Sequence, residues 1–271
     1  MSTLTLTLRE VPAQRLDLSP LSPDRLAGRS AAEVGAIELS SGNRRLRVDS
    51  LFKVAGGYES VLEICNSCDK LDRIGEAMTG GQVIVQGNAG AYLGARMKDG
   101  KIEVQGNVGA YGATGMRGGF IHIKGNAGDF LAAAIPGDPK GMQGGTVLVT
   151  GNTGERTGDR MRRGALLIEG DTGDYCGSRM IAGTIAVGGK VGRFPGLQMR
   201  RGTLLLRQAP GTLVPTFSDC GEHPLGFLTL LVKSWRTLPG AFAKLPESLS
   251  RVRRYMGDLA NDGRGEILIW V

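Results

Sequence analysis

The sequence has little of the chemistry on which many enzymes and metalloproteins depend. It contains two histidines and four cysteines in 271 residues, and aromatic residues make up 5% of it. Four cysteines are too few for a disulfide scaffold in a chain of this length, which favours a reducing compartment. No apolar run reaches the ~18 residues that a membrane helix needs. Residues 1–8 (MSTLTLTL) alternate like a strand and lack the pattern of a signal peptide. We therefore expect a soluble, cytoplasmic protein.

Glycine and positive charge are abundant, and the charge is unevenly placed. The chain has 44 glycines, without the every-third-residue period of collagen. Residues 78–207 hold 16 Lys/Arg and 9 Asp/Glu, a difference of +7, whereas the remainder holds 17 of each. The whole net charge of +7 therefore lies on the central segment.

This segment is an internal repeat, marked by methionine. The spacing is 19 residues except once, where an insertion around residues 133–139 (AAIPGDP) lengthens it to 26. The third residue after each methionine is Gly, a short strand with two apolar positions follows, and a corner Gly-(Asn/Asp/Lys)-x-Gly ends it. An aromatic residue stands two positions past each corner, except at Arg156. The repeating methionines are Met78, Met97, Met116, Met142, Met161, Met180 and Met199.

The period predicts an all-β fold, a right-handed parallel β-helix (solenoid) with 19-residue coils. One strand of about four residues cannot bury a face alone, but coils stacked about 4.8 Å apart pair each strand with its copies. Six-residue left-handed helices, nonapeptide calcium repeats and leucine-rich repeats do not fit the period or the consensus.

The two ends are expected to cap the solenoid. We predict an N-terminal cap over 1–58, the β-helix over 59–207 with 59–77 as a degenerate first coil, and a C-terminal cap over 208–271. Within that last cap, residues 226–232 (GFLTLLV) are predicted as a strand, 246–256 as a short helix that begins near a proline, and 266–271 as a last strand.

Few residues are candidates for catalysis or metal binding. Cys65 and Cys68 form a CxxC pair, but a structural zinc wants four ligands and the other two cysteines lie far off, so we interpret the pair as inert. His122 lies between two inward-facing isoleucines and should point outward, and His223 precedes a proline; both are interpreted as surface or interface residues. The glycine corners do not feed a helix, so they are not phosphate loops. We therefore predict no catalytic and no metal-binding residues.

Basic residues beside the methionines are the one candidate for binding. Because coils stack, these residues should form a ridge with rungs about 4.8 Å apart. The ridge is either a solvated face that resists aggregation or a track for a polyanionic carrier or an acidic partner. Nucleic acid is not expected, because no stacking aromatics interleave with the ridge. The basic ridge comprises Arg96, Lys98, Arg117, Arg160, Arg162, Arg163, Arg179, Arg200 and Arg201.

The repeat and its flanking motifs together make the sequence similar to a known family. It resembles the C subunit of formylmethanofuran dehydrogenase and of its bacterial relative, the formyltransferase/hydrolase complex. Besides the coils, the likeness covers residues 51–56 (LFKVAG), 72–75 (DRIG), 78–81 (MTGG) and 263–267 (GRGEI). A related β-helix ends the large subunit of glutamate synthase, but its amidotransferase and flavin domains are missing here. The overall pattern favours the bacterial, methylotroph-type version.

The resemblance implies a noncatalytic scaffold. In the bacterial complex a formyl group passes from formyl-tetrahydromethanopterin to a methanofuran-type carrier and is hydrolysed to formate. Two partners, a formyltransferase and a zinc-dependent amidohydrolase-like hydrolase, perform the chemistry. No cofactor is expected in this chain, and an acidic carrier tail would suit the ridge.

Two other hypotheses stay open. The chain could be the equivalent scaffold of an archaeal molybdenum or tungsten formylmethanofuran dehydrogenase, which metal content would distinguish. It could also be a free-standing solenoid enzyme of the polysaccharide-lyase kind, which needs carboxylates stacked with a basic residue in a groove. The acids at matching positions do not form such a set.

Overall fold

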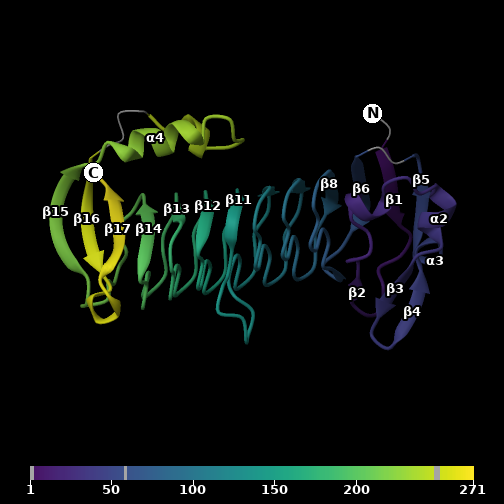
Figure 1. Cartoon of the computed structure of the whole chain (residues 1–271), viewed down its shortest axis with the longest axis horizontal. Coiled ribbons are helices and arrows are strands. Elements are labelled where there is room, and N and C mark those ends of the chain that lie inside the picture. Colours follow the sequence, from purple (N-terminus) through teal and green to yellow (C-terminus); the bar gives the residue numbers. More distant parts are fainter. Residues whose placement is uncertain (1–2, 58–59, 247–250) are drawn as a thin grey trace.

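The computed structural model describes residues 3–57, 60–246 and 251–271. Within them the protein is mostly β, which confirms the predicted all-β class. One sheet has 13 strands in the order β15-β16-β17-β14-β13-β12-β11-β10-β9-β8-β6-β1-β5, and a second has the order β4-β3-β2-β7. Successive repeats lie side by side along the long axis (Figure 1). No helix among the described residues is long and apolar enough to cross a membrane.

Each repeat contributes one strand to the large sheet, and neighbouring strands run parallel. Val83 lies opposite Ile102, and Ile102 lies opposite Ile121. The insertion does not disturb this register, because Ile121 lies opposite Val147. These strands are β8 (Gln82–Gly87), β9 (Lys101–Val104), β10 (Phe120–Ile123), β11 (Gln143–Val149), β12 (Arg163–Ile168), β13 (Thr184–Val187) and β14 (Arg201–Leu206).

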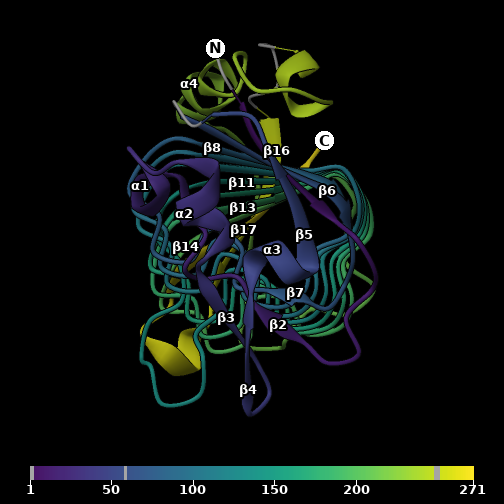
Figure 2. The ribbon, with the colours of Figure 1, turned by 90° about the vertical axis from the view of Figure 1, so that its right-hand side faces the viewer.

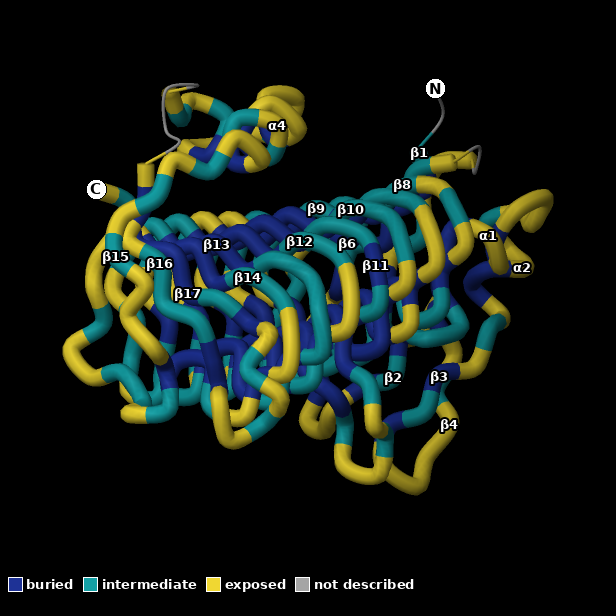
Figure 3. Tube along the Cα trace, turned by 60° about the vertical axis from the view of Figure 1, so that its left-hand side comes forward, coloured by how far each residue is buried: buried dark blue, intermediate teal, exposed yellow. Residues whose placement is uncertain are grey.

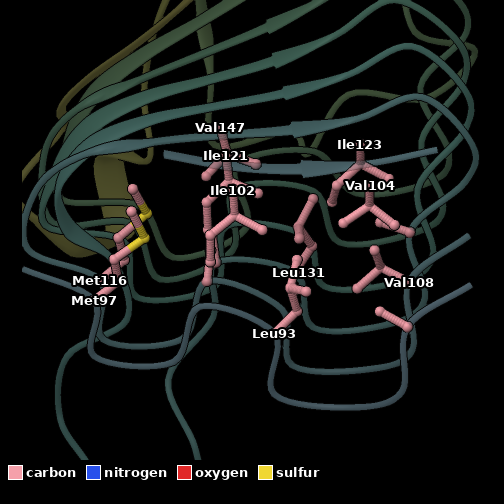
Figure 4. Close-up of a cluster of buried hydrophobic side chains, with 14 of the residues drawn as sticks. Leu93, Met97, Ile102, Val104, Val108, Met116, Ile121, Ile123, Leu131 and Val147 are labelled. Carbon is pink, nitrogen blue, oxygen red and sulfur yellow. The ribbon is translucent and has the colours of Figure 1, made fainter. Parts of the chain in front are cut away.

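The methionines form a buried column inside the stack. All seven repeating methionines have an exposed fraction of 0%, and Met97 and Met116 lie one above the other beside the Ile and Val rows (Figure 4). The glycine three residues later is required by the same packing. At Gly100, φ is +101° and an added Cβ would lie 2.5 Å from the Cε of Met78. The Met and Gly periods therefore have one structural cause.

Side-chain ladders lock the repeats together at the corners. The Asn88 Oδ1 accepts the backbone N–H of Asn107 at 2.8 Å, and the same bond recurs in each following repeat as far as the N–H of Lys190. The rings of Tyr111 and Phe130 stack with centroids 4.8 Å apart. Where the aromatic residue is missing, the Arg156 guanidinium lies 4.6 Å from the ring centroid of Tyr175 and continues the stack.

The N-terminal segment closes one end of the large sheet. The strand expected over residues 1–8 is confirmed for Thr3–Leu8, where Leu4, Leu6 and Leu8 are buried. β6 runs parallel to β8 and to β1, in the place expected for a first coil. The elements here are β1 (Thr3–Leu8), β2 (Leu16–Asp17), α1 (Pro23–Leu26), α2 (Ala31–Gly35), β3 (Glu38–Ser41), β4 (Arg44–Arg47), α3 (Val48–Leu51), β5 (Phe52–Ala55), β6 (Val61–Ser67) and β7 (Leu71–Asp72).

The C-terminal segment closes the other end. β17 pairs in parallel with β14, so that Ile267 lies opposite Leu204 and the last strand occupies the place of one more repeat. The strand predicted over 266–271 is thereby confirmed through Trp270. The elements here are β15 (Ser218–Pro224), α4 (Phe227–Ser234), η1 (Phe242–Lys244), β16 (Arg251–Gly257), η2 (Leu259–Asn261) and β17 (Arg264–Trp270).

Two predictions in this region are wrong. Residues 227–232, expected to be in a strand, lie in helix α4, because Leu228 and Val232 stand four residues apart and bury the same helical face. A short apolar run does not distinguish strand from helix by period alone. The helix expected over 246–256 is instead strand β16 from Arg251 on, because its backbone pairs antiparallel with β17 on one side and with β15 on the other. Residues 247–250 lie outside the described residues.

Helix α4 and the segment after it cover the outer face of the sheet. Leu148, Leu167, Ala186 and Leu205, one from each of four successive strands, are 0% exposed beneath this cover. The cover contributes buried residues of its own, among them Trp235. The molecule therefore has two cores, one inside the stack of repeats and one between the sheet and α4 (Figure 3).

Candidate anion-binding surface

Backbone hydrogen bonds place the residues that follow the methionines in one row. The N–H of Arg117 donates to the Met97 carbonyl at 2.7 Å, and the N–H of Arg200 donates to the Met180 carbonyl at 2.8 Å. The position after each methionine, which holds Lys98, Arg117, Arg162 and Arg200 of the ridge, therefore advances one repeat at a time. Seven of the nine ridge members are exposed, and Arg160 and Arg179 are half-buried.

The insertion divides the ridge in two. It leaves the stack just before Met142, so Arg96, Lys98 and Arg117 lie on its N-terminal side and the other six members on its C-terminal side. The insertion loop (teal) and the turn between β16 and β17 (yellow) project in the same direction and are separated along the long axis by the repeats of β12–β14 (Figure 1), and in the end-on view they lie at the same corner of the stack (Figure 2). Pro139 of the insertion and Asn261 of the turn line one hollow with Arg160 and Arg200. The sequence did not indicate that these two loops flank the same part of the ridge.

Three adjoining hollows lead from the insertion to the turn between β16 and β17. The first, about 230 Å³, lies between the insertion and Tyr111 and reaches Arg160. The second, about 380 Å³, shares Arg160 and reaches Ile181 and Arg200. The third, about 450 Å³, shares Ile181 and Arg200 and ends at Asp262. Each hollow shares lining residues with the next, and we call the three together the basic groove.

One member of the ridge has a dedicated partner. The Arg179 guanidinium donates to both carboxylate oxygens of Asp159, at 2.8 and 2.6 Å, and these hydrogen bonds raise the pKa of Arg179. Asp159 is 2% exposed and also accepts the Ser178 hydroxyl at 2.6 Å. The Asp159 carboxylate is therefore paired with the Arg179 guanidinium. Among the residues that the structure describes, the other eight ridge members form no ion pair.

A further exposed arginine lies beside Arg201 of the ridge and was missed from the sequence. Arg264, at the start of β17, pairs in register with Arg201 of β14, and both are exposed. Arg264 lies outside the repeat, so the 19-residue period could not predict that it lies beside the ridge. The motif at residues 263–267, which contains it, was the one available pointer.

The histidines are held apart from each other and from this groove. His122 lies on the outer face of β10, as expected, but it is only 7% exposed, and residues 237–239 line the same hollow. Of the two interpretations, surface or interface, the surface one is therefore wrong. Its Nε2 lies 3.2 Å from the Thr150 hydroxyl, and burial lowers its pKa. His223 is exposed, and its Nε2 lies 2.8 Å from the Cys220 carbonyl oxygen.

The cysteines are free thiols. Cys65 and Cys68 are half-buried, and burial together with the nearby Glu63 raises the pKa of Cys65. Cys176 is fully buried, which raises its pKa to about 12. No group of three or more His, Cys, Asp or Glu side chains suited to a metal ion occurs within residues 3–57, 60–246 and 251–271.

Comparison with known proteins decides the family. The chain is 45% identical to the C subunit of the formyltransferase/hydrolase complex of Methylorubrum extorquens, over 98% of both chains. It belongs to the family of formyltransferase/hydrolase complex C subunits. The crystal structure of that complex, which contains methylofuran, has a chain that matches this protein with a TM-score of 0.92 and 39% identity over 98% of each chain. No family model matches the sequence.

More distant relatives share only part of their length with this chain. The C subunit of a tungsten-containing formylmethanofuran dehydrogenase from Methanococcus maripaludis is 33% identical over 95 residues, which is 35% of that protein. A molybdenum-containing counterpart from Methanosarcina barkeri is 34% identical over 84 residues, or 28% of its length. The matches to the dehydrogenase subunits thus span about a third of those proteins.

Proposed function

We propose that this chain is the noncatalytic scaffold of a multisubunit complex. The complex would transfer a formyl group from formyl-tetrahydromethanopterin to a methanofuran-type carrier and hydrolyse it to formate, as part of one-carbon metabolism. The observation that carries the proposal is the end-to-end likeness to the C subunit of the formyltransferase/hydrolase complex. In this proposal a formyltransferase and an amidohydrolase-like protein, with its zinc, are the partners that perform the chemistry.

The arrangement of side chains supports a noncatalytic role. General acid–base chemistry needs a titratable group within hydrogen-bond reach of a reacting atom. His122 is buried against Thr150, and His223 contacts the Cys220 carbonyl oxygen on the exposed strand β15. The buried carboxylate of Asp159 is bonded to Arg179 and Ser178. These groups serve the fold and do not converge on a common site.

The basic ridge supports an anionic ligand for the same chain. Unpaired arginines on a rigid frame raise the local concentration of anions and bind carboxylates with two parallel hydrogen bonds. We infer that the ridge contacts either the acidic tail of the carrier or an acidic partner protein. The alternative is a solvated face, in which each charge contributes little.

We also infer the finer architecture and location. The parallel register at 19-residue intervals and the second row of bridges, from Ala89–Val108 to Thr172–Val191, support a right-handed parallel β-helix related to the end of glutamate synthase. Four free thiols are consistent with the cytoplasm.

An archaeal-type dehydrogenase scaffold is the second candidate. The partial matches to tungsten and molybdenum enzymes favour it, but the full-length match favours the bacterial type. A free-standing solenoid enzyme is not supported, because the acids that line the basic groove come from three different elements and form no stacked set.

The test is purification of the tagged chain from its native cell. We expect a formyltransferase and an amidohydrolase-like chain to co-purify, with zinc in the complex and formyl transfer by the complex but not by the isolated chain. Molybdenum or tungsten in the complex would favour the dehydrogenase alternative. Turnover by the isolated chain that survives repurification and disappears in His122→Gln or Cys65→Ser would contradict a scaffold role.

A further inference from the structure

The basic groove differs in character from one end to the other. At the insertion end, the stacked rings of Tyr111 and Phe130 face Ile135 and Pro136. This hollow of about 230 Å³ is below the 300–1,000 Å³ of ordinary small-molecule sites, and it suits a single side chain. An apolar or aromatic side chain placed here would pack against the two rings.

At the opposite end the lining is strongly basic. Arg162 and Arg163 come from one repeat and Arg200 and Arg201 from the second repeat after it, with Ile181 between the two pairs. Arginine binds carboxylates in a fixed, two-bonded geometry. Two exposed pairs on either side of an apolar floor can therefore hold carboxylates that project from a chain running over Ile181.

Carboxylates in the lining argue against a uniformly charged ligand. Asp138 lies at the insertion end and Asp262 at the arginine end, and neither forms an ion pair among the described residues. A nucleic acid or a continuous polyanion would place negative charge beside both of them. A chain that is apolar at the insertion end avoids the repulsion at Asp138, and at the other end four arginines outnumber Asp262.

Length also suits a peptide. The groove runs from Tyr111 to Arg200. Without the seven-residue insertion, these two residues are about four 19-residue spacings apart. At about 4.8 Å per spacing this is ~19 Å, which about six residues of extended chain cover. A segment of this length can place an apolar anchor at one end and acidic side chains at the other.

We propose that the basic groove binds an extended segment of a partner protein in the complex, and that this segment has one apolar or aromatic anchor followed by acidic residues. The anchor fills the hollow between the insertion and Tyr111, and the acids contact the arginine pairs beside Ile181. This inference rests on the proposed membership in a multisubunit complex. It means that the C-terminal half of the ridge binds a partner protein and not the carrier.

The test is site-specific photocrosslinking in the purified native complex. Ile181 is replaced by p-benzoylphenylalanine, and Lys98, in the same row on the other side of the insertion, serves as the matched control. We expect a crosslink from position 181 to one short partner segment with an apolar residue next to acidic ones, identified by mass spectrometry. We expect at least tenfold less of this product from position 98.

Variants test the two ends of the groove separately. Arg162→Gln with Arg200→Gln should weaken retention of the crosslinked partner at least tenfold, and Ile135→Asp should do so too. Arg44→Gln with Arg45→Gln removes the same charge from two exposed residues of β4, outside the ridge, and should leave retention unchanged. Circular dichroism and thermal unfolding establish that each variant is folded.

The outcomes are distinct. If the complex purifies but position 181 crosslinks to the carrier, to a partner segment without acids, or no more than position 98 does, the groove inference is overturned while the proposed function stands. If no partner chains co-purify at all, the proposed function itself fails.

Discussion

At the scale of the residue, the methionine column shows how one side chain can set a period. Each methionine is fully buried, and its terminal methyl group occupies the space that a Cβ would need at the glycine of the next repeat, as Met97 does at Gly119. Substitution on either side of this contact is costly, because Gly119 also has a φ of +84°. The repeat is thus maintained by reciprocal contacts between neighbouring copies.

Met161→Asp should destabilise the fold severely. It buries an unpaired charge between Met142 and Met180, which should lower the free energy of unfolding by about 3 kcal/mol or more. The midpoint of thermal unfolding should fall steeply. Lys140→Ala, in the insertion, is the control and should barely change it. Equal midpoints for the two variants would mean that the column is not buried.

His122 should give the fold a dependence on pH. Burial lowers the pKa of His122 below its usual 6.5, and the neighbouring Glu103 only partly offsets this. The unfolded chain then binds more protons than the folded one, so stability is greatest above about pH 6.5 and falls as the pH drops toward the folded-state pKa.

The measurement is unfolding by urea at several values between about pH 7.5 and 5. His122→Gln should flatten the decline in unfolding free energy, whereas His223→Gln, at an exposed site, should leave the decline as it is. A decline unchanged by His122→Gln would place its cause in other groups.

At the scale of the element, the cover formed by α4 and η1 turns a repeat surface into a second core. The outward residue in the middle of each strand is polar in β9 and β10, where it is Glu103 and His122. From β11 to β14 it is apolar: Leu148, Leu167, Ala186 and Leu205. Trp235 and Phe242 pack on these residues, with their rings edge to face at 5.5 Å. The cover is therefore packed on the strands whose outward residues are apolar, and its residues 237–239 reach beyond them to line a hollow with His122.

Trp235→Ala should loosen this cover. The side chain is 3% exposed, and removal of a buried Trp costs about 3–5 kcal/mol. We expect a lower urea midpoint and faster proteolysis within residues 235–245. Leu230→Ala lies on the same helix but at 70% exposure, and it should change neither. Full protection of that segment in the Trp235 variant would show that the cover is held by other contacts.

At the scale of the whole molecule, charge is concentrated on one side of a rigid frame. The +7 surplus lies entirely within residues 78–207, and most of the ridge arginines have no acidic partner among the described residues. Such charges act together on one multivalent anion, and screening weakens them beyond a Debye length of about 8 Å at physiological salt.

Replacement of Arg117, Arg162 and Arg200 by Gln should weaken assembly with the partner proteins while leaving the fold intact. The association constant of the unmodified chain should fall steeply with ionic strength, and that of the triple variant less steeply. Titration of labelled chain with the purified partners across ionic strength measures both. Identical salt dependence for the two proteins would favour the solvated-face interpretation.

The sequence alone determined the repeat, the strand in each copy and the position of the ridge, because identical local chemistry recurs every 19 residues and stacking follows from it. It also pointed to the right family. The cap elements were harder. Residues 226–232 and 251–256 occur once, their short apolar patterns fit either helix or strand, and neighbouring strands settled the outcome for β16.

The groove was decided by tertiary structure only. The insertion and the turn before Arg264 are more than a hundred residues apart in sequence, yet stacking brings both to the same side of the molecule, where they line one hollow. Likewise Asp159 and Arg179 become partners, and His122 becomes buried, through contacts between repeats and with the cover. The 19-residue period determines which residues of successive repeats lie above one another. The contacts of the non-repeating segments depend on where the insertion, the C-terminal turn and the α4 cover pack on the completed stack of repeats.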